Sequence, residues 1–413
     1  MIEFLTTYRS FSKPSRMLMI NQFAINTGFF MLMPYLAGYM AGPLGLAAWA
    51  VGLVLGIRNF SQQGMFLVGG TLADRLGYKP LIVAGCLLRT GGFALLAFAD
   101  SLPALLIASA ATGFAGALFN PAVRAYLAVD SADRRVEAFA MFNIFYQAGI
   151  LFGPVVGLAL MAFDFRATAA GSAIVFALLT LAQLRALPQH EAEQKTASVL
   201  DDWRVVVANR PFLLFSAAMI GCYVLSFQVY LALPMQATRV VGAEAAATLM
   251  TAVFVVSGLI AIAGQLRITR WFAARWGRPQ SLVFGMGILA AAFVPLLLVP
   301  GTGLGTPVAV GAMLVTAAVL GVGAAAVFPF EMDTVVALCG DRLVATHYGL
   351  YNTIVGVGIL LGNLGTGTIL DAARAAGVSS LAWAGLIAIG ALSAGGLALL
   401  ARSGRLDAPV PVG

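Results

Sequence analysis

The chain has 413 residues, of which 61% are hydrophobic and only 10% are charged, and its mean hydropathy is +0.93. A soluble domain carries roughly 25% charged residues, so the composition excludes a soluble protein and predicts an all-α protein that crosses a membrane many times. The three cysteines lie in apolar runs without CxxC or Cys/His spacing, which argues against disulfides and a zinc site.

Twelve apolar segments follow one another along the chain, each long enough for a membrane helix, which needs about 20 residues. They are 17–41, 46–70, 80–99, 103–129, 137–163, 166–187, 212–238, 243–270, 280–300, 306–339, 345–370 and 380–402. We predict a six-helix domain over 1–187, a cytoplasmic linker over 188–211, and a second six-helix domain over 212–413. The linker is either a plain connection or contains a short amphipathic helix around Val199–Ala208.

The positive charge lies mostly on one side of this arrangement. With the N-terminus inside, the outer loops hold only Arg166, Arg239 and Arg374. Basic residues gather in cytoplasmic loops, so both termini are expected in the cytoplasm. The net charge of +7 is therefore spread over one membrane face, which argues against a nucleic-acid partner.

An internal repeat relates the two halves. MLMPYLAGYMAG (31–42) aligns with LALPMQATRVVG (231–242), and LFNPAVRAYLAVDSADRR (118–135) aligns with VFPFEMDTVVALCGDRLV (327–344). Since each half has six spans, the halves point the same way. This pattern predicts two bundles related by a pseudo-twofold axis along the membrane normal, an architecture found in transporters.

The loop between the second and third spans reads GGTLADRLGYKP (69–80). Two adjacent glycines let helices approach closely, and Gly77 permits a sharp turn into the third span. Asp74 and Arg75 can pair with each other, with a neighbouring helix terminus, or with a basic loop. The alternative interpretation is a charged hairpin that only obeys the positive-inside rule.

As a pattern, this loop resembles the signature of the major facilitator superfamily. The resemblance is carried by Gly70, Leu72, Ala73, Asp74, Arg75, Gly77 and Lys79. It implies twelve helices in two halves, transport by alternating access, and a role for Gly70, Asp74, Arg75, Gly77 and Lys79 in conformational gating. The second-half copy, AARWGRP, has Ala274 in place of the acid.

The fifth span contains GILFGPVVGLAL (149–160), which resembles the antiporter motif of proton-coupled members of this superfamily. Its motif residues are Gly149, Gly153, Pro154 and Gly157. The alternative is ordinary small-residue packing between helices. One departure weakens the resemblance: where many drug/proton antiporters have an Arg four residues before a Gly of span four, this chain has Ser109 before Gly113.

Charges inside the bilayer are costly and are functional hypotheses by default. Glu331 and Asp333 lie late in the tenth span, and Arg124 occupies the repeat position of Asp333. Residues two apart project roughly 200° from each other on a helix, so we expect only one of the acids to face a cavity. We predict Glu331, Asp333 and Arg124 as proton-coupling candidates; the alternative is a fixed salt bridge with Arg124.

Polar residues within the spans are candidates for the substrate cavity, although each could instead form a hydrogen bond between helices. The candidates are Asn26, Arg58, Asn143, Tyr146, Gln147, Gln228 and Asn352.

The resemblance implies a proton-coupled exporter of amphipathic small molecules or drugs in the inner membrane of a bacterium, most similar to bacterial drug exporters. The expected partners are substrate, protons and the lipid bilayer, and the expected state is a monomer. No enzyme activity, metal or cofactor is expected, and no GxxxxGK[ST] loop for ATP occurs. Three alternatives remain: export of one metabolite such as a siderophore, nutrient symport, and a membrane sensor or scaffold without transport.

Overall fold

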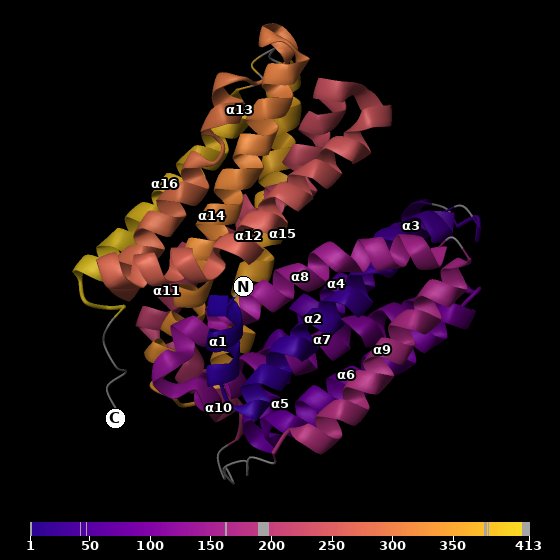
Figure 1. Cartoon of the computed structure of the whole chain (residues 1–413), viewed down its shortest axis with the longest axis vertical. Helices are drawn as coiled ribbons and strands as arrows, with labels where there is room; N and C mark the ends of the chain where they lie inside the picture. Colours follow the sequence, from indigo (N-terminus) through magenta and orange to yellow (C-terminus); the bar gives the residue numbers. More distant parts are fainter. Residues whose placement is uncertain are drawn as a thin grey trace. The chain divides into compact units, whose positions relative to one another are not determined.

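The computed structural model describes residues 2–41, 43–46, 48–161, 163–188, 198–375, 378 and 380–406. Throughout these residues the regular elements are helices (Figure 1). The central part of the predicted linker, 189–197, and the repeat residue Gly42 fall outside them. The chain forms two compact units: Met1–Asn209 with Cys339–Thr353, and Arg210–Leu338 with Ile354–Gly413.

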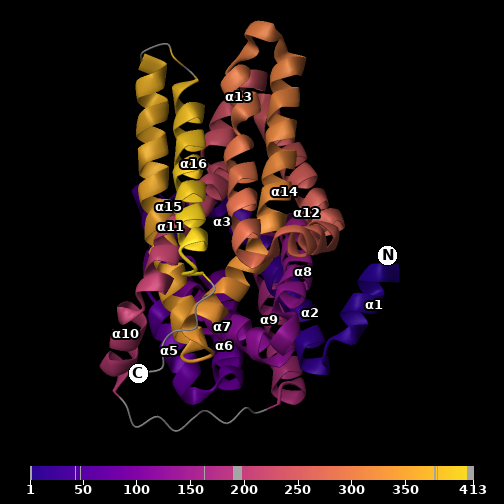
Figure 2. The same ribbon diagram turned by 90° about the vertical axis from the view of Figure 1, so that its left-hand side faces the viewer.

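The first unit contains ten helices among its described residues before the unit boundary at Asn209. They are α1 (Ile2–Ser10), α2 (Lys13–Phe30), α3 (Met33–Ala41), α4 (Ala48–Gln63), α5 (Phe66–Leu76), α6 (Tyr78–Phe98), α7 (Leu102–Ser131), α8 (Arg135–Met161), α9 (Phe165–Ala186) and α10 (Val199–Ala208). Helix α6 packs against α7 and α9, and α2 packs against α8 (Figure 2).

Helix α10 decides between the two interpretations of the linker. It spans Val199–Ala208, and a capping box at Ser198 and Asp201 begins it. The Ser198 hydroxyl accepts the N–H of Asp201, while the Asp201 carboxylate accepts the N–H of Ser198. Such reciprocal bonds satisfy two of the N–H groups that a helix start leaves open.

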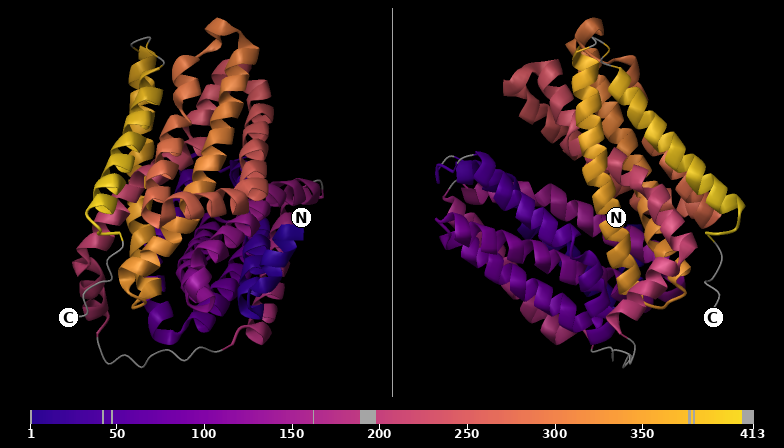
Figure 3. Two further views of the ribbon diagram at one scale, coloured as in Figure 1. Left: turned by 60° about the vertical axis from the view of Figure 1, so that its left-hand side comes forward. Right: turned by 180° about the vertical axis from the view of Figure 1, so that it is seen from behind.

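The second unit is built from α11 (Arg210–Phe227), α12 (Ala232–Ala291), α13 (Val294–Leu298), α14 (Thr306–Cys339), most of α15 (Val344–Ala375), and α16 (Leu381–Arg402), which Figure 3 shows from two sides. Helix α16 packs against α11 and α12. The first turns of α15, up to Thr353, belong to the first unit.

In the described part of the chain, eight helical stretches are long and apolar enough to cross a membrane. Two of them, Leu102–Met161 and Glu244–Leu298, have 60 and 55 residues. Because about 20 residues suffice for one crossing, each of these holds two of the predicted spans. The first two predicted spans are each divided into two shorter helices, α2 with α3 and α4 with α5. The twelve predicted segments thus all correspond to helical structure in the described residues.

Two glycines at equivalent repeat positions make the sharp turns between spans. Gly77 has φ 90° between α5 and α6, and Gly277 has φ 68° within the stretch assigned to α12. Only glycine adopts such angles without steric cost. The aligned segments ADRLG and AARWG therefore end in the same backbone geometry, as the repeat predicts.

Proline breaks the hydrogen-bond ladder of α14, and a side chain repairs it. Pro329 has no N–H and leaves the carbonyl of Ala325, four residues earlier, without its helical donor. The Nε2 of Gln265, on α12, donates to that carbonyl at 2.8 Å. This bond satisfies a buried acceptor just before the segment that carries Glu331 and Asp333.

Candidate functional site

The carboxylate of Asp74, near the end of α5, caps the first turn of α15. Its Oδ2 accepts the N–H and the hydroxyl of Thr346, both at 2.7 Å, and its Oδ1 accepts the N–H of Ala345 at 3.1 Å. The first N–H groups of a helix lack helical partners and lie at the positive end of its dipole. The sequence left three possible partners for Asp74: Arg75, a helix terminus or a basic loop. The structure shows the carboxylate bound to a helix terminus.

Gly69 and Gly70 allow α5 to approach two other helices. A Cβ atom on Gly70 would lie 2.1 Å from the carbonyl oxygen of Ala345, and one on Gly69 would lie 2.0 Å from that of Ala117. On the α15 side, a Cβ on Gly349 would lie 2.4 Å from the carbonyl oxygen of Phe66. A larger residue at Gly70 or Gly349 would force α5 and α15 apart and move Asp74 away from the N–H groups that it caps.

Arg75 forms an ion pair with the linker helix α10. Its Nη2 and Nε lie 2.7 and 2.8 Å from Oδ2 of Asp202, a buried carboxylate on α10. The indole N–H of Trp203 donates to the Thr71 hydroxyl at 2.8 Å. These two contacts attach α10 to α5. The sequence analysis did not identify Asp202, although its place on a short amphipathic helix was a usable signal. Lys79 lies in the first turn of α6, directly after the Gly77 turn.

The two acids of α14 point to different neighbours. Glu331, only 2% exposed, accepts the hydroxyl of Tyr223 on α11 at 2.6 Å. Asp333, 8% exposed, forms an ion pair with Arg278 at 3.2 Å. This divergence agrees with the angle expected for residues two apart on a helix. Arg278 was not among the predicted site residues.

Arg124, on α7, donates from Nη1 to Oδ1 of Asn352 at 3.0 Å. Asn352 in turn donates to the carbonyl of Tyr348 at 2.6 Å. The partner of Arg124 in this bond is thus a neutral amide within the first unit. An ion pair between Arg124 and Asp333 stays a prediction.

Several cavity candidates lie together on α2 and α8. Asn26 donates to the carbonyl of Tyr146 at 2.8 Å and accepts from Gln22 at 3.2 Å. Asn143 is buried on α8, one helical turn before the partly buried Gln147.

Gln228 belongs to the second unit, in the 3-10 turn Gln228–Tyr230. Its Nε2 donates to the carbonyl of Val224 at 2.8 Å, and its buried Oε1 has no hydrogen-bond partner among the described residues.

The glycines of the fifth-span motif face α2. Cβ atoms on Gly149, Gly153 and Gly157 would lie 2.5, 2.7 and 2.1 Å from atoms of α2 or the residue that follows it. In addition, the Tyr35 hydroxyl donates to the carbonyl of Pro154 at 2.8 Å. This geometry is the close packing that small residues permit, and it leaves antiport as a prediction.

Two arginines are placed inside the first unit without an acidic partner among the described residues. Arg89 on α6 is 4% exposed, and its guanidinium lies over the rings of Phe29, Phe119 and Phe176 at 5.2, 4.6 and 5.4 Å. Arg58 on α4 also lies over Phe29, at 4.5 Å. Burying an unpaired charge costs several kcal/mol, whereas a cation–π contact returns about 0.5–2 kcal/mol. The rings therefore offset only part of the cost.

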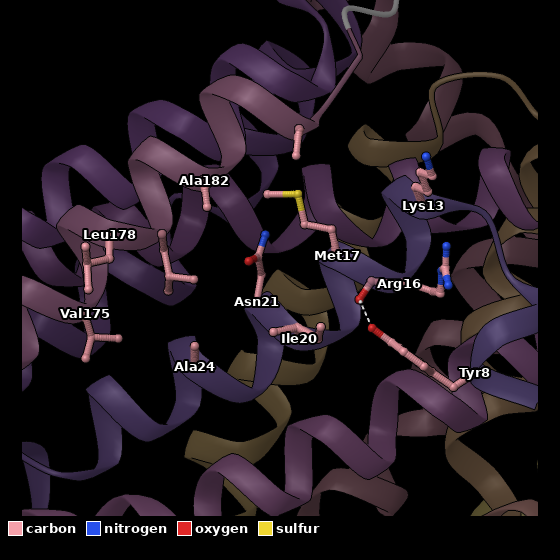
Figure 4. Close-up of a pocket in the computed structure, with 12 residues that line it drawn as sticks. Tyr8, Lys13, Arg16, Met17, Ile20, Asn21, Ala24, Val175, Leu178 and Ala182 are labelled. Atoms are coloured by element: carbon pink, nitrogen blue, oxygen red, sulfur yellow. Dashed lines mark hydrogen bonds between the residues drawn. The ribbon is translucent and has the colours of Figure 1, made fainter. Parts of the chain in front are cut away.

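A groove of about 710 Å³ lies between the N-terminal helices α1 and α2 and helix α9 (Figure 4). Its wall is mostly apolar, with Lys13 and Arg16 toward one end and Asn21 pointing into it. No residue predicted for proton coupling or substrate binding lines it. The groove is therefore separate from the polar residues on α2 and α8 described above.

Comparisons with known proteins agree with this architecture. The Major Facilitator Superfamily profile matches residues 18–363. An MFS-type transporter of Mycobacterium tuberculosis is 65% identical over 94% of both chains. Multidrug resistance protein MdtH of Edwardsiella ictaluri is 31% identical over 95% of this chain and 94% of its own. The human organic anion transporter MFSD10 (TETRAN) has a TM-score of 0.73 at 15% identity, covering 93% of this chain and 99% of its own.

The helical repeat, the loop that caps α15 and the match over most of the chain lead to one assignment. This chain belongs to the major facilitator superfamily and is a membrane transporter with the fold of twelve helices in two halves.

Proposed function

We propose that the protein is a proton-coupled antiporter that exports amphipathic small molecules across the bacterial inner membrane by alternating access. Relatives named as multidrug resistance proteins support export of drug-like compounds. The distribution of Lys and Arg supports cytoplasmic termini.

One observation carries the proton-coupling part of the proposal: the different environments of the two acids on α14. A coupling carboxyl group must lose and regain a proton in every cycle. Proton binding at Asp333 would have to break its ion pair with Arg278, whereas Glu331 is hydrogen-bonded by the neutral Tyr223 hydroxyl. A hydroxyl can donate to a carboxylate or accept from a carboxylic acid, so Tyr223 can serve both protonation states. We therefore assign coupling to Glu331 and a structural or gating role to Asp333.

The loop contacts fit the alternating-access part of the proposal. Asp74 holds the start of α15 by three hydrogen bonds, and these must loosen if that helix end moves during transport. Arg75 and Asp202 add an ion pair to the linker helix. A set of short polar contacts, each breakable without unfolding a helix, is suited to a reversible gate.

The test is transport in proteoliposomes with an imposed pH gradient. We expect Glu331→Gln to abolish gradient-driven accumulation of an amphipathic dye while keeping exchange of labelled for unlabelled dye at equal pH. Tyr223→Phe removes only the hydroxyl and should shift the pH dependence of transport without abolishing it.

Asp333→Asn is the matched control, since it changes an acid two residues away on the same helix. We expect it to weaken the Arg278 contact but to retain pH-driven transport. Full gradient-driven transport by Glu331→Gln would overturn the assignment of this residue.

A further inference from the structure

Arg58 and Arg89 are left unexplained by proton coupling. Both lie within predicted spans, Arg58 on α4 and Arg89 on α6, and their contacts are with neutral groups. Arg58 donates to the side-chain oxygens of Asn59 and Gln62 at 2.7 and 2.8 Å. The guanidinium of Arg89 lies over three aromatic rings, and the Nε atoms of both arginines lack a hydrogen-bond partner among the described residues.

No carboxylate among the described residues of the first unit forms an ion pair with Arg58 or Arg89. Between residues 48 and 186 the acids occur only near helix ends: Asp74, Asp100, Asp130, Asp133, Glu137 and Asp164. Asp74 caps α15, and Asp100 pairs with Arg166. The interior of the spanning helices in this part of the structure is therefore positively charged.

The two charges are close together because both guanidinium groups lie near the same ring, that of Phe29. Like charges in a medium of low dielectric repel strongly. An anion beside them would offset this repulsion. It would also accept hydrogen bonds from guanidinium N–H groups, whose planar arrangement matches the two oxygens of a carboxylate. Of the two side chains, Arg58 is partly exposed, whereas Arg89 is only 4% exposed.

The surroundings also suit an apolar body attached to the anionic group. Phe29 offers an aromatic face beside Arg58. Gln62 adds an amide next to the same guanidinium. A guanidinium beside an aromatic ring is suited to bind an amphipathic molecule that has an anionic group and an apolar body.

We propose that Arg58 binds the anionic group of the substrate, so that the transported molecules are organic anions such as aromatic or aliphatic carboxylates. Arg89 is a positioning residue that raises the positive potential behind this contact. The inference rests on the proposed transport function and specifies its substrate class.

Binding by the full-length protein in lipid nanodiscs tests this, measured by isothermal titration calorimetry with two pairs of probes that differ in charge. The pairs are 1-naphthoate with 1-naphthamide, and octanoate with octanamide. We expect at least one acid to bind tenfold or more tightly than its amide. Arg58→Gln should remove this preference, and Arg58→Lys, which keeps the charge but not the fork, should retain part of it.

Arg267→Gln is the matched control, because Arg267 is an exposed arginine on the spanning helix α12 of the second unit. It should leave the preference unchanged. Thermal unfolding identifies any variant that fails to fold. If Arg58→Gln fails to fold, the binding preference of Arg58→Lys for acids over amides is used in its place. Equal binding of acids and amides by the wild-type protein, or an unchanged preference in the Arg58 variants, would overturn the inference.

Binding needs no proton gradient, so the two proposals fail separately. If pH-driven transport proves absent while the acid preference and its loss in Arg58→Gln are observed, only the coupling mechanism is wrong. If pH-driven transport is present but acids and amides bind alike, only the substrate class is wrong.

Discussion

Replacing Asp74 by Asn tests the physical basis of the loop motif. The carboxylate satisfies the N–H groups of both Ala345 and Thr346, one with each oxygen. An amide of the same shape has only one acceptor oxygen and no charge. We therefore expect one of the two N–H groups to lose its acceptor and the helix dipole to lose its counter-charge.

The magnitude follows from these contacts. A hydrogen bond to a charged group contributes about 1.5–3 kcal/mol, and a charge at a helix end about 0.3–1 kcal/mol. A loss of about 2–3 kcal/mol in the free energy of local opening corresponds to roughly 30- to 150-fold faster amide exchange, since about 1.4 kcal/mol is a factor of ten.

Hydrogen exchange by mass spectrometry on peptides covering 339–353 measures this change. Asp100→Asn removes a carboxylate that pairs with Arg166 and not with the 339–353 segment, and it should leave exchange in this peptide unchanged. The reasoning is refuted if Asp74→Asn exchanges at the wild-type rate in the first turn of α15, because the capping bonds would then contribute nothing there.

Two further substitutions probe packing and buried polar groups. Gly157→Ala places a Cβ 2.1 Å from the carbonyl oxygen of Met31 and should lower the apparent Tm in detergent by several degrees, whereas Gly91→Ala, which meets nothing within 4 Å, should not. A Tm unchanged in both would contradict the close packing of α8 on α2. Gln265→Met removes the donor to the Ala325 carbonyl and should destabilise the second unit by about 1–3 kcal/mol; unaltered exchange protection in α14 would argue against this role.

Sequence patterns with short range were reliable predictors of local structure. Apolar runs predicted the spanning helices because membrane crossing depends on length and hydropathy alone. The turn at Gly77 and its repeat at Gly277 were readable from the aligned loops. The helix Val199–Ala208 could be named but not chosen over a plain linker, since ten residues rarely form a stable helix without tertiary contacts.

Sequence patterns did not predict which residues pair with the charged side chains. The sequence placed Glu331 and Asp333 on opposite sides of one helix but could not name Tyr223 or Arg278. Likewise, Arg75 was predicted to interact, yet its partner Asp202 lies 127 positions away. Each such contact depends on which helices become neighbours and on their rotation.

The sequence by itself thus determined the membrane class, the helical segments, the two halves and the family to which this chain belongs, because each is encoded in local composition or in a repeated motif. Only the tertiary structure decided that Asp74 caps α15, that Asp333 pairs with Arg278, that Glu331 accepts the Tyr223 hydroxyl, and that Arg58 and Arg89 share one aromatic ring. The physical reason is that hydropathy acts along the chain, whereas ion pairs and hydrogen bonds need atoms within a few ångströms, which only helix packing brings together.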